Sequence, residues 1–510
     1  MDSSSLIWSS LLLLLSLVLC LNRKNWRTDN GNKNRPPGPT GWPLVGNIFD
    51  LGIMAHRILY ELKLKYGPVL RLRLGSVDTV VIQSAKAAME LFKNHDASFC
   101  DRTVPCVLTP HNYKDGSLAL GRFGPYWRTL RRICAIELLA NRRMNETVQI
   151  RRKCIDVMIR SIEDDMAAGK ASGESGIVHI PHYLFVMTFN LIGNLMLSKD
   201  LFDSKCKEGY EFFEAMDKVM VWAGTPNLAD FLPFLQWLDP QGLIRNMSRD
   251  MGRAKDIVAG FVKERIEDYK MGKKKANKDF LDVLLEFEGD GKEWEGKIPY
   301  DKIIIIILEM FFAGPETTSS TMEWVMAELF SDPKALRKVK DELDTVVGEN
   351  RKVEESDIDK LPYLQAVIKE TCRLHPVVPL LLPRNTIEDT NFMGYHISKG
   401  TQVLVNAWAI GRDPESWEDP MNFKPERFLG SKIDFKGQNF ELIPFGSGRR
   451  ICVGMGLAQR VVPLGLASLL HNFEWDLDSQ TLDMRERMAI TVRKLVPLNL
   501  ACRKRPTKSS

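Results

Sequence analysis

The chain has 510 residues, of which 44% are hydrophobic and 26% charged, and its net charge is +5. This composition is typical of a globular protein with a large core, and so small a net charge argues against nucleic acid as a main partner. Nine cysteines without a CxxC pair, in a chain of this size, argue against a disulfide framework and favour a reducing compartment.

The N-terminus carries an apolar run, Leu6–Leu21, that only three serines interrupt. Counted from Ser3, it approaches the ~20 residues that a helix needs to cross a bilayer. A cleaved signal peptide is the alternative, but no Lys or Arg precedes the run and no clear cleavage site follows it. The basic residues come after it, at Arg23, Lys24 and Arg27. By the positive-inside rule we therefore expect a retained membrane anchor over residues 1–26, with the bulk of the chain in the cytosol.

Residues 27–47 are predicted to be a tether and a proline-rich hinge. Four prolines in Pro36–Pro43 exclude a helix and favour a stiff, extended segment. A plain linker is the alternative.

After the hinge, apolar and polar residues alternate from Tyr66 to Ile82, which predicts a β-hairpin with its turn at Gly75-Ser76.

Most of the remaining chain has the pattern of helices, apart from a second strand region near residues 388–405. The predicted helices include Ala85–Asn94, Tyr126–Leu139, Met251–Met271, Asp301–Ser331, Ala335–Val347 and Leu364–Arg373.

Trp127 and Arg131 lie four residues apart and share one face of their predicted helix. An indole N–H and a guanidinium that point the same way suit a carboxylate ligand. An amphipathic surface helix without a ligand is the alternative. Arg128 and Arg132 lie about 100° further round and form a second basic edge.

The segment Asp301–Ser331 is so apolar, with five consecutive isoleucines at 303–307, that we expect a central buried helix. Its middle is poorly suited to a regular helix, because Pro315 removes a backbone hydrogen bond and Thr317 can compete for carbonyls. We expect a locally opened groove there that water or a ligand fills. Glu316 and Thr317 in such a groove would form an acid and hydroxyl relay for protons. A kinked helix whose polar residues face solvent is the alternative.

Glu370 and Arg373 are spaced for an ion pair within one helix, a pair that contributes little when exposed. Arg427, in the stretch Phe423–Phe428, can complete a buried Glu–Arg–Arg network. We expect that network to fix the core beside the loop described next.

One cysteine, Cys452, lies in the glycine-rich stretch Phe445–Gly454, directly before a long apolar run. A thiolate is a soft, strongly donating metal ligand, and glycines let the backbone approach a bulky flat group closely. Backbone N–H groups of the turn, together with Arg449 and Arg450, can stabilise the negative sulfur. The stretch predicts that Cys452 is the axial ligand of a haem iron.

These motifs resemble those of the cytochrome P-450 family of haem-thiolate monooxygenases. The residues Phe445, Gly448, Arg450, Cys452 and Gly454 match every fixed position of the family's haem-loop signature. The stretches Ala313–Thr318, Glu370–Arg373, Pro425–Phe428 and Trp127–Arg131 match its other motifs, in the family's order. Pro315 occupies the variable position of the oxygen-activation motif, where it can widen the groove.

The resemblance implies a mainly α fold with small β-sheets and a long central helix that crosses the haem. Residues 48–510 would then be one haem-binding domain, although length alone suggests two or three. The cofactor would be heme b with Cys452 as its thiolate ligand, and Glu316 and Thr317 would deliver protons. The other implied cofactor-binding residues are Trp127, Arg131, Arg384, Phe445 and Arg450, and the implied structural residues are Glu370, Arg373 and Arg427.

The implied substrate pocket is apolar, and no charged side chain is expected to converge on it. Its predicted residues are Phe311, Phe312, Ala313, Val377, Val378, Leu381 and Ile490. Each of them can instead be an ordinary core residue. A small hydrophobic substrate fits such a pocket best.

The stretches Leu361–Val367, Val403–Ala409 and Phe440–Pro444 resemble plant microsomal members, in particular the geraniol/iridoid hydroxylase group. This likeness implies hydroxylation of a terpenoid, of monoterpenoid or iridoid type. Oxidation or coupling of a phenolic or alkaloid is the alternative, and a non-catalytic, membrane-tethered haem protein is a more remote one.

The resemblance also implies dioxygen and an external electron donor, because the chain has no glycine-rich nucleotide fingerprint. The implied partner is NADPH-cytochrome P-450 reductase at the endoplasmic reticulum membrane, on its cytosolic side. Candidate docking charges are Arg128, Arg132, Arg142 and Arg143, which can also be a plain solvated face.

Overall fold

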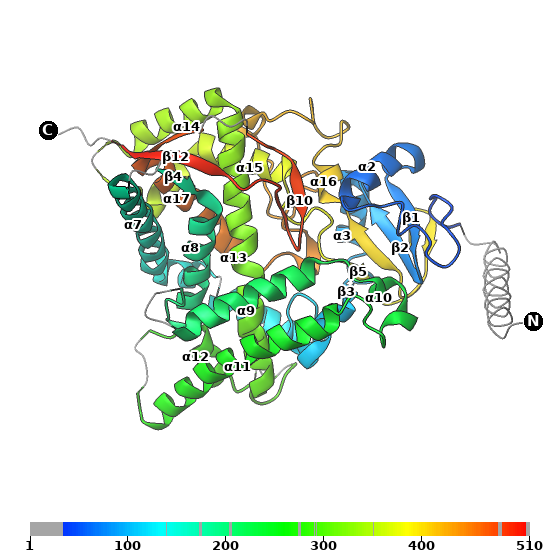
Figure 1. Ribbon diagram of the computed structural model, residues 1–510. Coiled ribbons are helices and arrows are strands. Elements are labelled where there is room, and N and C mark those ends of the chain that lie inside the picture. Colours follow the sequence, from blue (N-terminus) through cyan, green and yellow to red (C-terminus); the bar gives the residue numbers. More distant parts are fainter. Residues whose placement is uncertain are drawn as a thin grey trace, which may run out of the picture.

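The computed structural model describes residues 34–138, 140–172, 176–202, 207–273, 277–289, 291, 293–349, 351–477 and 482–505. The predicted anchor and the first part of the tether lie outside these residues. The described chain is mainly helical, as expected. Figure 1 shows a large helical part around the central helix α13 and a smaller part, at the right, built on the sheet that contains β1 and β2.

The helices differ widely in length. They are α2 (Ala55–Tyr66), α3 (Ala85–Asn94), α4 (Tyr113–Gly116), α5 (Pro125–Ile133), α6 (Asn141–Glu146), α7 (Val148–Ser172), α8 (Ile180–Leu197), α9 (Lys207–Gly224), α10 (Leu228–Phe231), α11 (Leu243–Lys270), α12 (Phe280–Glu286), α13 (Tyr300–Ser331), α14 (Pro333–Val346), α15 (Pro362–Leu374), α16 (Ala407–Ile410) and α17 (Met455–Asn472).

The strands of the described residues are short and form four small sheets. They are β1 (Val69–Leu74), β2 (Val77–Ile82), β3 (Asp101–Arg102), β4 (Ile177–His179), β5 (Arg384–Asn385), β6 (Thr390–Phe392), β7 (Tyr395–Ile397), β8 (Gln402–Val405), β9 (Phe473–Asp476), β10 (Glu486–Met488), β11 (Val492–Lys494) and β12 (Asn499–Lys504).

The largest sheet has the strand order β1-β2-β8-β5-β3. Its first two strands are the predicted hairpin, with Leu74 opposite Val77 across the turn. β8 runs parallel to β2, and β5 joins β8 to β3, so that Arg384 lies opposite Arg102. The proline-rich segment runs beside this sheet, where the Arg71 N–H donates to the Pro37 carbonyl (2.8 Å).

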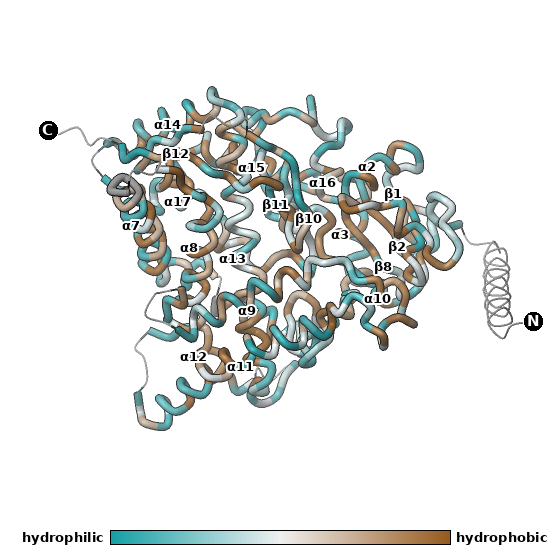
Figure 2. Tube along the Cα trace, viewed as in Figure 1, coloured by the Kyte–Doolittle hydropathy of each residue, from teal (hydrophilic) through white to brown (hydrophobic). Residues whose placement is uncertain are grey.

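The central helix α13 is buried because nearly every turn of it is apolar. All five isoleucines at 303–307 are buried, and Figure 2 shows apolar segments gathered around α13 and α8. Both helices are long and apolar enough to span a membrane, but 72% of the most apolar window of each is buried inside the protein. This burial identifies them as core helices.

The local opening predicted at Pro315 is not a break in the helix, because α13 continues through the proline from Tyr300 to Ser331. The hydroxyl of Thr188 on α8 donates to the Pro315 carbonyl (3.2 Å), so α8 supplies a donor at this point. A Cβ added to Gly314 would lie 2.9 Å from the Ile192 side chain. α8 therefore packs closely against the Gly314-Pro315 turn.

Two predicted helices have different bounds. The helix expected over Tyr126–Leu139 is α-helical only to Ile133 and continues as a π-turn over Cys134–Leu138. The helix expected from Met251 begins at Leu243, because the Asp239 carboxylate caps it by accepting from Ile244 N (3.2 Å) and Arg245 N (3.0 Å). The apolar residues that follow this cap are irregularly spaced, which is why periodicity alone does not predict that the helix begins at Leu243.

Candidate active site

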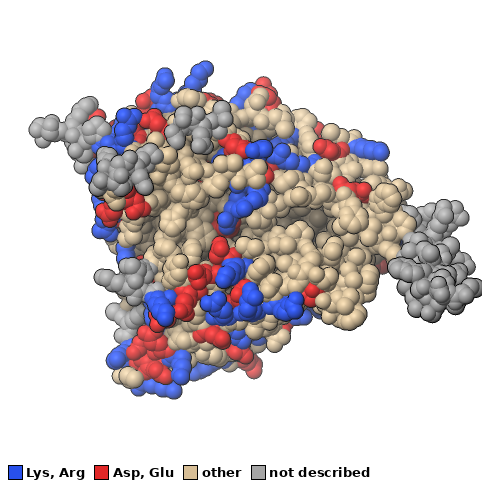
Figure 3. Space-filling model, viewed as in Figure 1, with Lys and Arg blue, Asp and Glu red and all other residues tan. Residues whose placement is uncertain are grey.

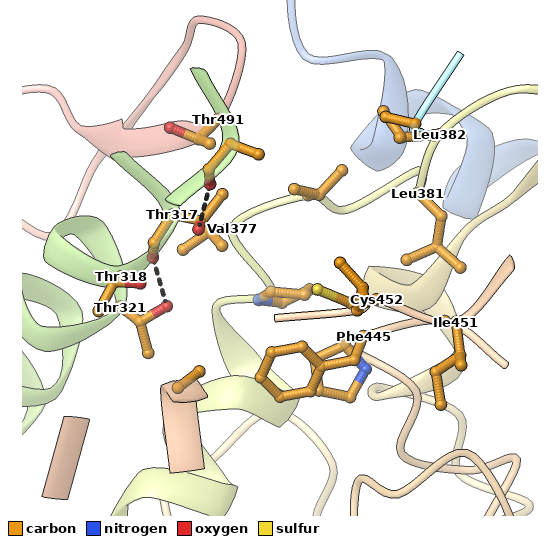
Figure 4. Close-up of a pocket in the computed structure, with 18 of the residues that line it drawn as sticks. Thr317, Thr318, Thr321, Val377, Leu381, Leu382, Phe445, Ile451, Cys452 and Thr491 are labelled. Carbon is orange, nitrogen blue, oxygen red and sulfur yellow. Dashed lines mark hydrogen bonds between the residues drawn. The ribbon is translucent and has the colours of Figure 1, made fainter. Parts of the chain in front are cut away.

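A cavity of about 660 Å³ lies between α13 and the loop that carries Cys452. Its walls include parts of residues 102–131, 376–384, 444–453 and 490–491. Figure 4 shows Thr317, Thr318 and Thr321 of α13 on one side of it and Cys452 with Phe445 on the other. A concave space of this size is typical of a small-molecule or cofactor site.

The Cys452 thiol is exposed to this cavity and lies at the beginning of α17. The Cys452 N–H donates to the Phe445 carbonyl (2.9 Å), which closes the loop. Burial raises the pKa of the Cys452 thiol, whereas the Gly454 N–H, the charge of Arg131 and the Met455 N–H lower it. These three groups favour the thiolate, the form that binds a metal.

The loop before Cys452 needs a glycine at position 448. Gly448 has a φ of +70°, in the left-handed region, and a side chain there would collide with the Asp96 carboxylate. That carboxylate accepts from the Arg449 N–H (2.8 Å) and pairs with Arg384 (2.9 Å). The loop is thereby fixed to the segment before β3.

Predicted cofactor-binding residues gather at one edge of the cavity. The Arg450 guanidinium lies 4.0 Å from the centre of the Trp127 ring and donates to the carbonyls of Cys100 (2.8 Å) and Gly121 (2.6 Å). Burial lowers the pKa of Arg450 to about 10. The Trp127 indole was expected to face a carboxylate, but its N–H donates to the Leu118 carbonyl (2.7 Å). Trp127 therefore supports the neighbouring chain segment.

Arg102 belongs to the same cationic group and was missed from the sequence. Its Cα lies opposite that of Arg384 in the β3–β5 pair, and it donates to the carbonyls of Ala119 (3.0 Å) and Leu382 (2.7 Å). Burial lowers the pKa of Arg102, and the nearby charges of Arg384 and Arg450 lower it further. We call Arg102, Arg384 and Arg450 the cationic cluster.

Glu316 and Thr317 both line the cavity, but they have different partners. The buried Glu316 carboxylate accepts from the Thr491 hydroxyl (2.6 Å) and pairs with Arg493 of β11. The Thr317 hydroxyl donates to the Ala313 carbonyl (2.9 Å), one turn earlier in α13. The acid is thus tied to the β10–β11 side of the cavity, and the hydroxyl is tied to the helix.

The structure brings Glu370, Arg373 and Arg427 together in a buried network. Arg373 makes two bonds of 2.7 Å to the two oxygens of Glu370, and the Arg427 Nε donates to the same carboxylate (3.0 Å). Arg373 also donates to the carbonyls of Gly411, Pro420 and Asn422. The network therefore joins α15 to the loops around residues 411–427.

Comparisons with known proteins agree with this geometry. A model of the family described as cytochrome P450 matches residues 36–499. The chain belongs to the cytochrome P450 family. Among curated proteins it is 55% identical to the iridoid oxidase of Catharanthus roseus, covering 97% of this chain and 96% of that one. It is 40% identical to the geraniol 8-hydroxylase of the same plant, covering 96% and 97%.

Solved structures confirm the P450 fold. A zebra fish cytochrome P450 in a structure with progesterone is 25% identical, with a TM-score of 0.75 over 88% of this chain and 99% of that one. The protein is therefore a P450 monooxygenase, which implies a haem with a thiolate ligand, dioxygen, a hydrophobic substrate and a redox partner.

The residues of this P450 fit a haem. A haem carries two carboxylates, and the cationic cluster with Arg131 presents four cations to the cavity edge, where Asp96 is the ion-pair partner of Arg384. Cys452 lies across the cavity from α13, and Phe445 lies beside it (Figure 4). Cys452 would hold the iron, and the cationic cluster with Arg131 would neutralise the carboxylates.

Six of the seven predicted substrate-pocket residues line the cavity of this P450: Phe312, Ala313, Val377, Val378, Leu381 and Ile490. Phe311 is the exception. It is fully buried and packs against Phe189 (ring centres 5.1 Å apart) and Phe212 (4.9 Å). Successive residues of a helix point about 100° apart, so Phe311 faces α8 and α9 while Phe312 faces the cavity.

This difference gives a paired prediction. Phe311→Ala should lower the free energy of unfolding by about 3–5 kcal/mol, because it leaves a hole in a packed aromatic cluster. Phe312→Ala should change the ratio of products and the KM, with a smaller loss of stability. Denaturant unfolding and product analysis of both variants check this. Equal effects of the two variants on product ratio would contradict it.

The expectation that no charged side chain converges on the pocket is wrong. Glu309 of α13 lines the cavity and is buried. Its carboxylate accepts from Leu118 N (2.5 Å), Ala119 N (3.2 Å) and the Tyr113 hydroxyl (3.4 Å), and from the Ser117 hydroxyl. Burial raises the pKa of Glu309, and these donors lower it. In the sequence it is one acid in an apolar helix, with no signal of its partners.

Three of the four candidate docking arginines, Arg128, Arg142 and Arg143, pair with acids of this chain. Arg128 pairs with Glu293 (2.7 Å), and Arg143 pairs with Glu146 (2.6 Å). Arg142 is more exposed and lies 3.7 Å from Glu146. Their role as docking charges stays a prediction.

Proposed function

We propose that this P450 hydroxylates or oxidises a terpenoid of monoterpenoid or iridoid type. One observation carries the proposal: the cavity that contains Cys452 has a mainly apolar wall, to which Phe312, Ala313, Val377, Val378, Leu381 and Ile490 contribute. The same 660 Å³ must also hold the haem, which favours a small substrate. The names of the related iridoid oxidase and geraniol 8-hydroxylase support this class.

Bound haem, which we propose to be heme b, supplies the binding and activation of dioxygen. The chain's own residues supply protons and exclude water. Thr317 offers a hydroxyl beside the cavity, and Glu316 offers a carboxylate that the Thr491 hydroxyl and Arg493 hold ready. Protons that reach Glu316 would pass to the cavity through the side-chain hydroxyls of Thr491 and Thr317.

Thr317→Ala should lower the rate of product formation by about 10²-fold, since a positioned proton donor contributes this much. NADPH oxidation should continue, with hydrogen peroxide in place of product. The control is Thr345→Ala on α14, whose exposed hydroxyl makes the same bond to the carbonyl one turn back (2.8 Å). Product per NADPH and peroxide are measured together. An unchanged ratio in Thr317→Ala would remove Thr317 from the proton path.

For electrons we propose NADPH-cytochrome P-450 reductase, and for location the endoplasmic reticulum membrane with the catalytic domain, residues 48–510, facing the cytosol. Residues 1–26 would be the anchor and residues 27–47 the tether and hinge. The hydrogen bond from Arg71 to Pro37 supports a hinge with a fixed angle.

On the face in Figure 3 the region over α10, β1 and β2 is mostly uncharged. Phe234 and Trp237, just after α10, are 62% and 81% exposed, which favours contact with a membrane.

The substrate class is tested with a panel of terpenoids and phenolics, given to microsomes that contain the protein, the reductase and NADPH. We expect oxidised terpenoids and little turnover of phenolics. Coupled phenolic products in the absence of terpenoid products would favour the alternative, an oxidative coupling enzyme.

A further inference from the structure

Glu309 is a buried acid that the proposed chemistry does not use. It lies one turn before Ala313 on α13, its residue is 3% exposed, and it belongs to the cavity wall. An ionisable side chain in such a place needs partners, because burying a charge is costly without them.

All of the partners described above come from one short piece of chain, Tyr113–Ala119. Two successive backbone N–H groups, those of Leu118 and Ala119, point at the carboxylate, which is an arrangement that binds anions. The piece also presses closely on α13, since a Cβ added to Gly116 would lie 2.8 Å from the Ile305 side chain. Glu309 thus fixes this piece of chain to the central helix.

The backbone carbonyls of the same segment and of Gly121 accept hydrogen bonds from side chains that line the cavity edge. Leu118 O accepts from the Trp127 indole (2.7 Å) and from Arg450 (3.3 Å). Ala119 O accepts from Arg102 (3.0 Å), and Gly121 O accepts from Arg450 (2.6 Å). We call residues 117–121 the strap. Its N–H groups face the carboxyl oxygens of Glu309 and its carbonyls face cations, so each set of bonds polarises and strengthens the other.

We propose that Glu309 is a positioning residue that couples the substrate chamber to the haem edge through the strap. When Glu309 holds the strap, the carbonyls of Leu118, Ala119 and Gly121 hold Arg102, Arg450 and Trp127. Loss of the carboxylate frees the strap, and Arg102 and Arg450 of the cationic cluster then lose the contacts that it makes with them. The inference depends on the haem site and not on which terpenoid is oxidised.

The test compares Glu309→Gln with Glu323→Gln in the full-length holoenzyme. Glu323 is a matched control because it is also buried on α13 and accepts from one backbone N–H, that of Leu498 (3.0 Å), away from the strap. Two properties are measured: hydrogen–deuterium exchange of peptides over 113–121 and 492–500, and the rate at which haem passes to an excess of a haem-free acceptor protein.

Glu309→Gln removes the carboxylate and leaves one acceptor oxygen for the four donors that face Glu309. We expect exchange over 113–121 to be about tenfold faster and haem loss to be about tenfold faster, because buried donors lose their acceptor. Exchange over 492–500 should not change. Glu323→Gln should do the reverse, with faster exchange over 492–500 and an unchanged rate of haem loss.

Wild-type exchange over 113–121, or wild-type haem loss, in Glu309→Gln would overturn the proposal. Equal acceleration of haem loss in Glu323→Gln would also overturn it, since the effect would then be general destabilisation. If Glu309→Gln does not fold, Ser117→Ala removes one of the contacts and leaves the carboxylate. It should accelerate exchange over 113–121 and haem loss together, by a smaller factor, and no change in either would overturn the proposal.

Discussion

Reduced Cys452→Ala protein is expected to lack the red-shifted carbon monoxide band of a haem-thiolate protein entirely. The Cys452 sulfur lies near the start of α17, where burial raises the pKa of the thiol and the Gly454 N–H, the charge of Arg131 and the Met455 N–H lower it. Alanine has no donor atom, so the iron would lose its thiolate and with it the electron donation that favours O–O cleavage. Product formation should fall to background.

The control for this experiment is Cys154→Ala. Cys154 is buried on α7 in the helical core and does not line the cavity. It should keep the band at full height and cost only some stability. A normal band in Cys452→Ala would mean that another residue ligates the iron.

Arg373→Ala is expected to give little or no folded, haem-loaded protein. Arg373 is 1% exposed and is the main partner of the fully buried Glu370. Breaking a buried ion pair costs about 3–5 kcal/mol, because one charge stays buried without its partner. Three backbone carbonyls lose their donor as well. Such a loss is a large part of the ~5–15 kcal/mol that stabilises a folded protein.

Arg373→Lys should rescue little, since an ammonium group cannot make the forked contacts of a guanidinium. An exposed pair provides the comparison. Arg503 and Asp476 also form an ion pair (2.6 Å), but both side chains are more than half exposed, so Arg503→Ala should fold and load haem normally. Denaturant midpoints and haem per protein are measured for all three variants. A midpoint for Arg373→Ala close to that of Arg503→Ala would show that the network is not structural.

Local sequence patterns predicted the elements and residues that depend on short spacing. The β1–β2 hairpin follows from alternation around Gly75-Ser76, and α3 follows from its apolar periodicity. The break between α13 and α14 follows from Asp332-Pro333, and Asp332 does cap α14 by accepting from Lys334 N (3.0 Å). The sequence indicates Cys452 as the candidate haem ligand because its chemistry and its glycine-rich loop occur in one stretch of ten residues, and the structure places it on the cavity wall.

Other features depend on contacts between residues that are far apart in the sequence, and the local spacing of residues does not show such contacts. Arg102 joins the cationic cluster only because two-residue strands pair it with Arg384, 282 positions away. Phe311 and Phe312 cannot be told apart by pattern, because the apolar run at 303–308 covers every face of α13 just before them. Glu309 has partners about 190 residues earlier in the chain. The packing of the whole molecule decides each of these cases.

The most direct test of terpenoid oxidation at Cys452 is isotopic. Microsomes with the protein, the reductase and NADPH are given a monoterpenoid alcohol under ¹⁸O₂, and the product is analysed by mass spectrometry. One ¹⁸O atom is predicted in the hydroxylated product, since the other atom of dioxygen leaves as water, with no product from microsomes that contain Cys452→Ala. Hydroxylated terpenoid without the label, or labelled product from Cys452→Ala, would contradict it.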